Sequence, residues 1–189
     1  MTSTNTPSEV SADDRPCTVQ ATDSAAEVPR ACVVIRACAV TRVTGHRHPL
    51  LAAAAALAAQ HRQRVEAQQL TCDLVADDRA LAIAARAIAA ADTGRTVLID
   101  RIDHWACVAL LENRRAAVHT ESLGQLVDRF AGTWTQWNLI KDREDPRSAD
   151  LASMLLHHVS ELSIGYDDLV ADLRAGRRRL PRHQNPIAA

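Results

Sequence analysis

The stretch His119–Arg143, HTESLGQLVDRFAGTWTQWNLIKDR, decides the fold class. Its large apolar residues recur at spacings of three and four, which is the pattern of an amphipathic helix. These residues are Leu123, Leu126, Val127, Phe130, Trp134 and Trp137. Thr120 is predicted to cap the helix, because its hydroxyl can accept a hydrogen bond from a backbone N–H of the first turn, and Glu121 favours the helix dipole there. We therefore predict a helix that starts at Thr120 and ends before Pro146.

Three further helices are predicted. Apolar residues at helical spacing extend over residues 49–72, 77–115 and 148–175. Pro49 suits a first helical position, Ser148 is expected to cap the last helix, and Gly176 and Pro181 are expected to end it. Because the connections are short, sequential helices are expected to be antiparallel. The predicted fold is all-α: an up-down antiparallel four-helix bundle with a disordered N-terminal tail.

The N-terminal part differs in composition from the rest. Residues 1–29 are rich in Ser, Thr, Asp and Pro and contain almost no bulky apolar residues, so they are predicted to be disordered. The next segment, Ala31–Val43, is β-branched and poorly periodic, and it could form either a docked, strand-like arm or a loose linker. The predicted organisation is a disordered or poorly ordered arm (1–45), a helical-bundle domain (46–176) and a basic C-terminal tail (177–189).

Composition and charge exclude several classes of function. The net charge of −1 provides no basic field for a nucleic acid, and the few aromatic residues (3%) are not arranged as a stacking platform. Five cysteines without a C-x-x-C pair argue against a disulfide framework and a zinc site. The N-terminus lacks the pattern of a signal peptide, and the alanine-rich run Leu51–Ala59 is too short to span a bilayer. We expect a cytoplasmic protein without a cofactor, a metal ion, a nucleic-acid partner or a membrane partner.

Three polar residues occupy helix positions where an apolar residue is expected: His61, Arg95 and His158. An α-helix rises about 1.5 Å per residue, and aligning the predicted helices on this basis places the three residues within about two turns of one height. No acidic residue is expected at that height, so an anionic ligand, a partner or solvent would have to balance the charge of Arg95. The alternative is structural: hydrogen-bonded core histidines, and an arginine whose stem covers apolar surface.

A second polar level is predicted about two turns away. Asp128 and Arg129 are expected near Asp103 on the neighbouring helix, and Glu121 shares a stripe with Asp128 and two glycines, which allow a close approach. The stripe could be a binding site, or a solvated acidic face beside a helix crossing. The candidate ligand-binding residues are therefore His61, Arg95, Asp103, Glu121, Asp128, Arg129 and His158.

Four segments, taken in order, resemble a bacterial family of all-helical domains of unknown function. They are His48–Arg62, Gly94–Trp105, His119–Phe130 and Tyr166–Pro181, and the last of them resembles actinobacterial members. The most specific piece is Thr-Glu-x-x-Gly followed by Asp-Arg. The positions that match the family pattern are His61, Arg95, Asp100, Thr120, Glu121, Gly124, Asp128 and Arg129.

The sequence also departs from that pattern. Arg64 stands where the pattern has Asn, and Thr71 and Cys72 stand where it has acidic residues. Gln136 and Leu139 stand where it has Lys and His. These departures put in doubt any family activity that depends on those side chains.

Three functions are open at the level of sequence. The protein could bind a small anionic ligand or a protein partner through polar residues in or beside its core. It could instead be an enzyme acting on a phosphorylated or sugar-type metabolite. Arg95 and Arg129 would then hold the anion, and His61 or His158 would be the acid–base group. It could also be a structural homodimer, whose interface would be an exposed edge at Trp134 and Trp137.

Overall fold

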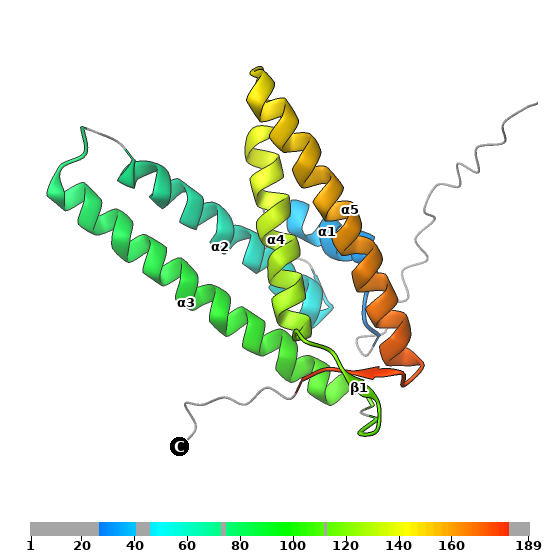
Figure 1. The fold of residues 1–189 in the computed structure, drawn as a ribbon. Helices are drawn as coiled ribbons and strands as arrows, with labels where there is room; N and C mark the ends of the chain where they lie inside the picture. The colour runs from blue at the N-terminus through cyan, green and yellow to red at the C-terminus, as the bar shows by residue number, and fades with distance from the viewer. Residues whose placement is uncertain (1–26, 41–45, 73–74, 112, 182–189) are drawn as a thin grey trace, which may run out of the picture.

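The computed structural model describes residues 27–40, 46–72, 75–111 and 113–181. These residues form five helices and two short strands: α1 Ala31–Ala39, α2 Pro49–Thr71, α3 Asp78–Ala109, β1 Ala117–Val118, α4 Leu123–Ile140, α5 Pro146–Arg174 and β2 Arg178–Arg179. The protein is therefore mainly helical, as the sequence predicts (Figure 1). No helix within these ranges is long and apolar enough to cross a bilayer. The predicted disorder of residues 1–26 and the end of the predicted basic tail, 182–189, lie outside the described residues.

The four predicted helices pair as two antiparallel hairpins. α2 packs along α3, and α4 packs along α5. The two hairpins cross at an angle, and the ends that carry their turns diverge (Figure 1). The described residues thus form two crossed hairpins and a fifth helix, and not the single four-helix up-down bundle that the sequence suggests.

The fifth helix, α1, lies in the range predicted as a poorly ordered arm. It packs against α2, α4 and α5, and it buries Val34 and Cys38 completely. At its start, the Ala31 N–H donates to Asp167 Oδ1 of α5 at 2.8 Å. The prediction of a disordered or poorly ordered arm over residues 1–45 is wrong for residues 31–39, which form neither a strand-like arm nor a linker. A helix of nine residues is marginal alone, so packing against the hairpins accounts for its stability.

Two helices, α4 and α5, are capped at their N-termini by residues other than those predicted. α4 begins with a capping box: Ser122 Oγ accepts from the Gln125 N–H, and Gln125 Oε1 accepts from the Ser122 N–H. Ser122, and not Thr120, is therefore the N-cap. Likewise, α5 is capped by Asp145, whose Oδ1 accepts from the backbone N–H of Ser148 at 2.9 Å.

The other helix boundaries are close to those predicted, with one exception. α2 starts at Pro49 as expected. α5 ends at Arg174, and Gly176 follows with a φ of 64°, a left-handed conformation that favours glycine after a helix. α3, however, ends at Ala109 and does not continue to residue 115. The connection from α3 to α4 is consequently longer than predicted.

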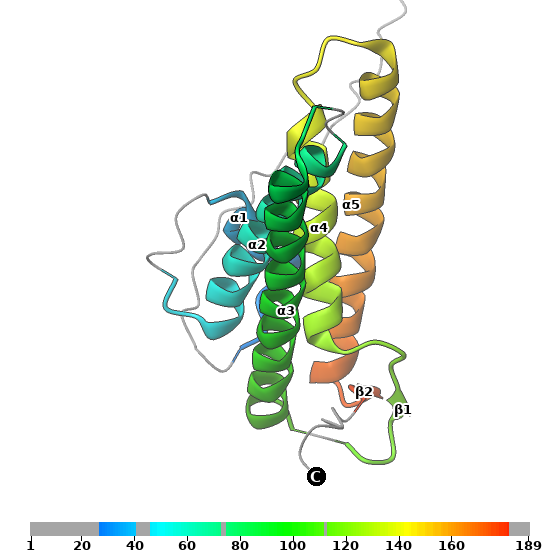
Figure 2. The same cartoon turned by 90° about the vertical axis from the view of Figure 1, so that its left-hand side faces the viewer.

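This long connection is fixed to the end of the chain by the two short strands. β1 pairs with β2 in parallel, Ala117 with Arg178 and Val118 with Arg179. The His119 N–H then donates to the Arg179 carbonyl at 2.8 Å. Figure 2 shows the pair at one end of the molecule, just past the end of α5 and near the end of α3. The strands thereby hold His119 and the residues after it beside the start of α4.

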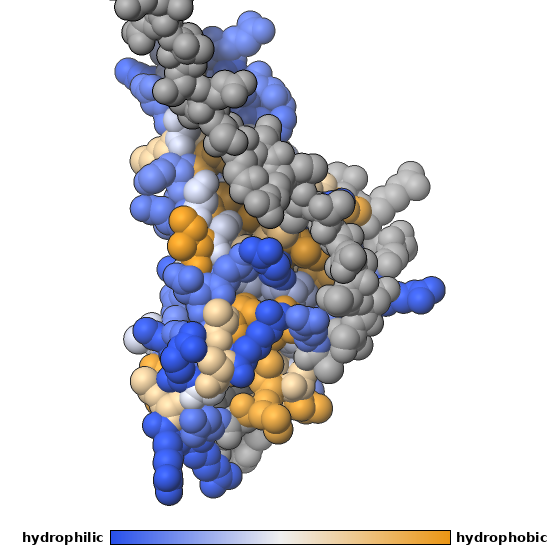
Figure 3. All heavy atoms as spheres, turned by 90° about the vertical axis from the view of Figure 1, so that its right-hand side faces the viewer, coloured by the Kyte–Doolittle hydropathy of each residue, from blue (hydrophilic) through white to orange (hydrophobic). Residues whose placement is uncertain are grey.

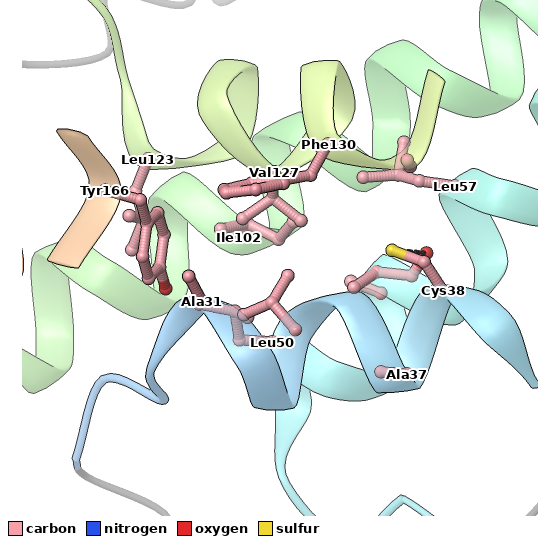
Figure 4. Close-up of a cluster of buried hydrophobic side chains, with 14 of the residues drawn as sticks. Ala31, Ala37, Cys38, Leu50, Leu57, Ile102, Leu123, Val127, Phe130 and Tyr166 are labelled. Carbon is pink, nitrogen blue, oxygen red and sulfur yellow. Dashed lines mark hydrogen bonds between the residues drawn. The ribbon is translucent and has the colours of Figure 1, made fainter. Parts of the chain in front are cut away.

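The hydrophobic core lies where α1 and the two hairpins meet. Figure 4 shows Phe130 and Tyr166 on one side of it and Leu50 on the other. The rings of Phe130 and Tyr166 pack edge to face with centroids 5.5 Å apart, which joins α4 to α5. Ile102 brings α3 into the same cluster. The core thus fixes the start of α4 against three neighbouring helices.

Candidate functional site

Three of the candidate residues meet between α2, α3 and α4. Asp128 on α4 accepts hydrogen bonds from Arg95 on α3, with distances of 2.6 Å from Nη2 to Oδ2 and 3.0 Å from Nε to Oδ1. His61 on α2 shares the same carboxylate, with Nε2 2.9 Å from Oδ1. The Asp128 side chain is only 10% exposed, so this carboxylate is buried between its two partners.

The cluster continues toward solvent through a second carboxylate. Asp92 accepts from Arg95 Nη1 at 3.0 Å and from Arg64 Nε at 2.9 Å. We call these five residues, Arg64, Asp92, Arg95, Asp128 and His61, the ion-pair network. The prediction that Arg95 has no acidic partner is wrong, because two carboxylates bind its guanidinium.

The ion-pair network sets the protonation state of Asp128. Burial alone would raise the pKa of its carboxyl group, but the hydrogen bonds from His61 and Arg95 outweigh that effect and lower the pKa to about 2. The same carboxylate raises the pKa of Arg95 further above its usual value. Asp128 is therefore a carboxylate at neutral pH, with its charge balanced inside the protein.

Two glycines of α4 allow the helices to cross closely at this point. A Cβ atom on Gly132 would lie 2.9 Å from Cε1 of the His61 ring, and one on Gly124 would lie 2.5 Å from the carbonyl oxygen of Ile99. The Gly124 N–H also donates to Asp103 Oδ1 at 2.7 Å, so Asp103 binds the N-terminal end of α4. The stripe of Gly124, Asp128 and Gly132 thus lies at a helix crossing, and the burial of Asp128 shows that this part of it is not a solvated acidic face.

The remaining candidates lie around a different feature, an open cleft between α4 and α5. Its volume is about 420 Å³. The residues that line it come from the connection before α4, from α4 and from α5; they are His119, Thr120, Glu121, Leu126, Arg129, His158, Glu161, Leu162, Gly165 and Tyr166. We call this feature the α4–α5 cleft. It brings Glu121, Arg129 and His158 together, away from His61 and Arg95.

Charged and ionisable side chains converge on the α4–α5 cleft. Arg129 Nη2 lies 2.6 Å from Glu121 Oε2, and both side chains are partly exposed, at 48% and 33%. His119 Nδ1 lies 2.9 Å from the Glu121 carbonyl. On α5, His158 Nδ1 lies 4.0 Å from Glu161 Oε2. The cleft therefore contains one guanidinium, two imidazoles and two carboxylates over apolar side chains.

The structure divides the seven predicted site residues into three groups. His61, Arg95 and Asp128 form the ion-pair network, Asp103 binds the start of α4, and the other three line the cleft. His158 does not join His61 and Arg95, because its side chain is half exposed on α5. Sequence reasoning missed His119 and Asp92. The only available signal for His119 was its position next to Thr120 and Glu121 in the motif.

The tryptophan edge expected at a dimer interface is partly covered. Trp134 and Trp137 are half-buried, and their rings pack against each other with centroids 4.8 Å apart. The large apolar side chains that α5 does expose include Leu151, Met154 and Ile164. Figure 3 shows that hydrophobic residues on this side of the molecule are interrupted by hydrophilic ones.

The family of the chain follows from a comparison with known protein families. The model of the family described as "Protein of unknown function (DUF4254)" matches residues 52–181. The chain belongs to this family. The match starts inside α2 and ends after β2, so it covers the ion-pair network and the α4–α5 cleft and leaves α1 outside. No curated protein and no solved structure matches the chain significantly.

The positions at which the sequence departs from the resemblance have structural surroundings of their own. Arg64 belongs to the ion-pair network through Asp92. Gln136 and Leu139 line an apolar groove between α2, α4 and α5 together with Val65 and Leu155. Gln136 and Leu139 therefore lie apart from the α4–α5 cleft, in a part of the molecule where the two hairpins diverge.

Proposed function

We propose that the protein binds a small anionic molecule in the α4–α5 cleft. The observation that carries the proposal is the convergence of Arg129, His119 and His158 on one open hollow of about 420 Å³. A guanidinium is well suited to bind carboxylate or phosphate oxygens in pairs, and an imidazole can donate a hydrogen bond to the same group. The apolar residues Leu126 and Leu162 are also part of the lining.

The two candidate arginines differ in how free their guanidinium groups are to bind an anion. Arg95 is 25% exposed and is bound by two carboxylates, one of them buried. Among the described residues, Arg129 pairs with Glu121, and that pair is partly exposed to solvent. Such pairs contribute about 0–1 kcal/mol, so an incoming anion can replace the Glu121 carboxylate at little expense. We therefore place the anion at Arg129 and assign Arg95 a structural role.

Isothermal titration with inorganic phosphate tests the proposal. Arg129→Gln should weaken phosphate binding at least about tenfold, the loss expected for one charge-assisted contact. Glu121→Gln should strengthen it, because the competing carboxylate is removed. Arg86→Gln is the matched control, since Arg86 is exposed on α3. Equal phosphate affinity in the Arg129 and Arg86 variants would contradict the proposal, as would an unchanged affinity in the Glu121 variant.

A second function is an enzyme acting on a phosphorylated or sugar-type metabolite. The observation that favours it is the presence of His158 and Glu161 on the same cleft wall, opposite Arg129, because acid–base catalysis needs such groups beside a bound anion. Phosphate release from a panel of sugar phosphates would test it. Activity that Glu161→Gln abolishes, with phosphate affinity retained, supports the enzyme. If no member of the panel is turned over, the proposal that remains is anion binding. The cytoplasmic location and the homodimer stay predictions.

A further inference from the structure

Within the described residues, four glycines lie inside helices, and three of them are explained by close neighbours. Added Cβ atoms would meet Gln60 at Gly94, the Ile99 carbonyl at Gly124 and His61 at Gly132, all within 3.0 Å. Gly165 on α5 is different, because a Cβ atom there would meet nothing within 4 Å in the described part of the chain. The packing that these residues show does not require glycine at this position.

Gly165 is also unfavourable for the helix that contains it. A glycine inside a helix lowers helix stability relative to alanine, because it loses more backbone freedom on folding. The position is exposed, and it lies in the middle of the long helix α5. Alanine would satisfy the fold at least as well.

The location of Gly165 offers a reason for the missing side chain. Gly165 lines the α4–α5 cleft on the same wall as His158, Glu161 and Leu162, opposite Arg129. Because Gly165 has no side chain, the backbone of α5 borders the cleft directly at this point, and the space that a Cβ atom would take is open. Glycine is the residue that allows another group to approach a backbone closely.

We infer that Gly165 leaves space for a flat, ring-shaped body of the bound anion. The ring lies against the α5 backbone at Gly165 and over Leu162, while the anionic group reaches Arg129. The ligand class is then a phosphate or carboxylate attached to a flat ring, and Gly165 is a specificity-determining residue. This inference rests on the proposed anion binding in the α4–α5 cleft and adds the chemistry of the rest of the ligand.

The test compares two probes, inorganic phosphate and phenyl phosphate, by isothermal titration of the full chain. Phenyl phosphate should bind the parent protein about tenfold more tightly, since one buried ring face is worth on the order of two buried methylene groups. Gly165→Leu should remove that gain and leave the affinity for inorganic phosphate within about twofold of the parent value. Ala171→Leu is the matched control, because it adds the same side chain at an exposed position of α5 outside the cleft.

Thermal unfolding separates a role in binding from a role in packing. Gly165→Ala should raise the melting temperature by about 2–4 °C, because it replaces an interior glycine without a clash. A fall in melting temperature would show that Gly165 is needed for packing and would overturn the inference. The inference is also overturned if phenyl phosphate binds the parent protein no more tightly than phosphate does. It is likewise overturned if phenyl phosphate binds the Gly165→Leu variant as tightly as the parent. Neither result contradicts the proposed anion binding. Binding of neither probe to the parent protein would overturn both.

Discussion

Arg95 and Asp128 form a two-point ion pair between α3 and α4, with Nη2 2.6 Å from Oδ2 and Nε 3.0 Å from Oδ1. Because of this pair, the guanidinium of Arg95 is not free to bind an anion. An arginine without a counter-ion would be a natural anion site, but this guanidinium already balances a buried carboxylate. The proposed anion site therefore lies at Arg129 in the α4–α5 cleft, where the partner of the guanidinium among the described residues is the partly exposed Glu121.

Arg95→Met should destabilise the protein. The methionine keeps the apolar stem but leaves Asp128 buried with His61 as its remaining partner, and breaking a buried pair in this way typically costs about 3–5 kcal/mol. Because Arg95 is 25% exposed, we expect about 2–3 kcal/mol in a urea unfolding experiment, with phosphate affinity unchanged. The control is Arg86→Met. If Arg95→Met instead preserved stability and abolished phosphate binding, the anion site would lie at Arg95.

Gly132→Ala and Gly124→Ala should both destabilise the fold. The new Cβ atom would lie 2.9 Å from the His61 ring in the first variant and 2.5 Å from the backbone oxygen of Ile99 in the second. Overpacking of this kind costs about 1–3 kcal/mol, and Gly124→Ala should be the more severe, because backbone moves less easily than a side chain. Gly165→Ala is the comparison: its added Cβ atom would enter open space, so this variant should stabilise the fold. A stabilising Gly132→Ala would mean that the helices do not cross closely there.

Asp128 should make stability depend on pH in the acid range. Its pKa is lowered from 3.8 to about 2 in the native state, so the unfolded chain binds this proton more readily. The contribution, about 2 kcal/mol, is fully present above about pH 4 and is lost as the pH falls through 2. Urea unfolding between pH 5 and about pH 2 measures it. Asp128→Asn should flatten the curve relative to the parent, whereas the exposed-site control Asp150→Asn should not.

The sequence predicts which residues share a helix face better than it predicts their heights. The spacing predicts Asp128 about two turns away from the level of Arg95, but Asp128 is the partner of Arg95. The error comes from the connection between α3 and α4. α3 ends at Ala109, α4 begins at Leu123, and β1, which lies between them, pairs with β2. Periodicity gives no information on where such a connection returns the chain, so the ion-pair network could not be predicted from spacing.

Other differences arise because tertiary packing overrides local signals. Val33 and Val34 favour a strand in isolation, yet α1 is helical because its buried side chains fit between the hairpins. The N-cap of α4 could have been predicted from the sequence, since Ser122 and Gln125 have the spacing of a capping box. The α4–α5 cleft could not be predicted from the sequence, because its walls come from two segments of the chain that lie about thirty residues apart, 119–129 and 158–166.

The contribution of α1 to the core can be measured with one substitution. Val34 is fully buried, so Val34→Ala should cost about 2 kcal/mol of stability, the size typical of a truncated core side chain. Val40→Ala is the matched control, because Val40 follows the same helix and is 40% exposed. Equal, small effects in urea unfolding would show that α1 is not part of the cooperative core in solution.

The most direct test of the central claim is a phosphate titration followed in ¹H–¹⁵N correlation spectra of the whole chain. If the anion binds in the α4–α5 cleft, the backbone amides that shift should lie in residues 119–129 and 158–166, and Arg129→Gln should remove those shifts. Shifts centred on His61, Asp92 and Arg95, or no shifts at all, would contradict the account.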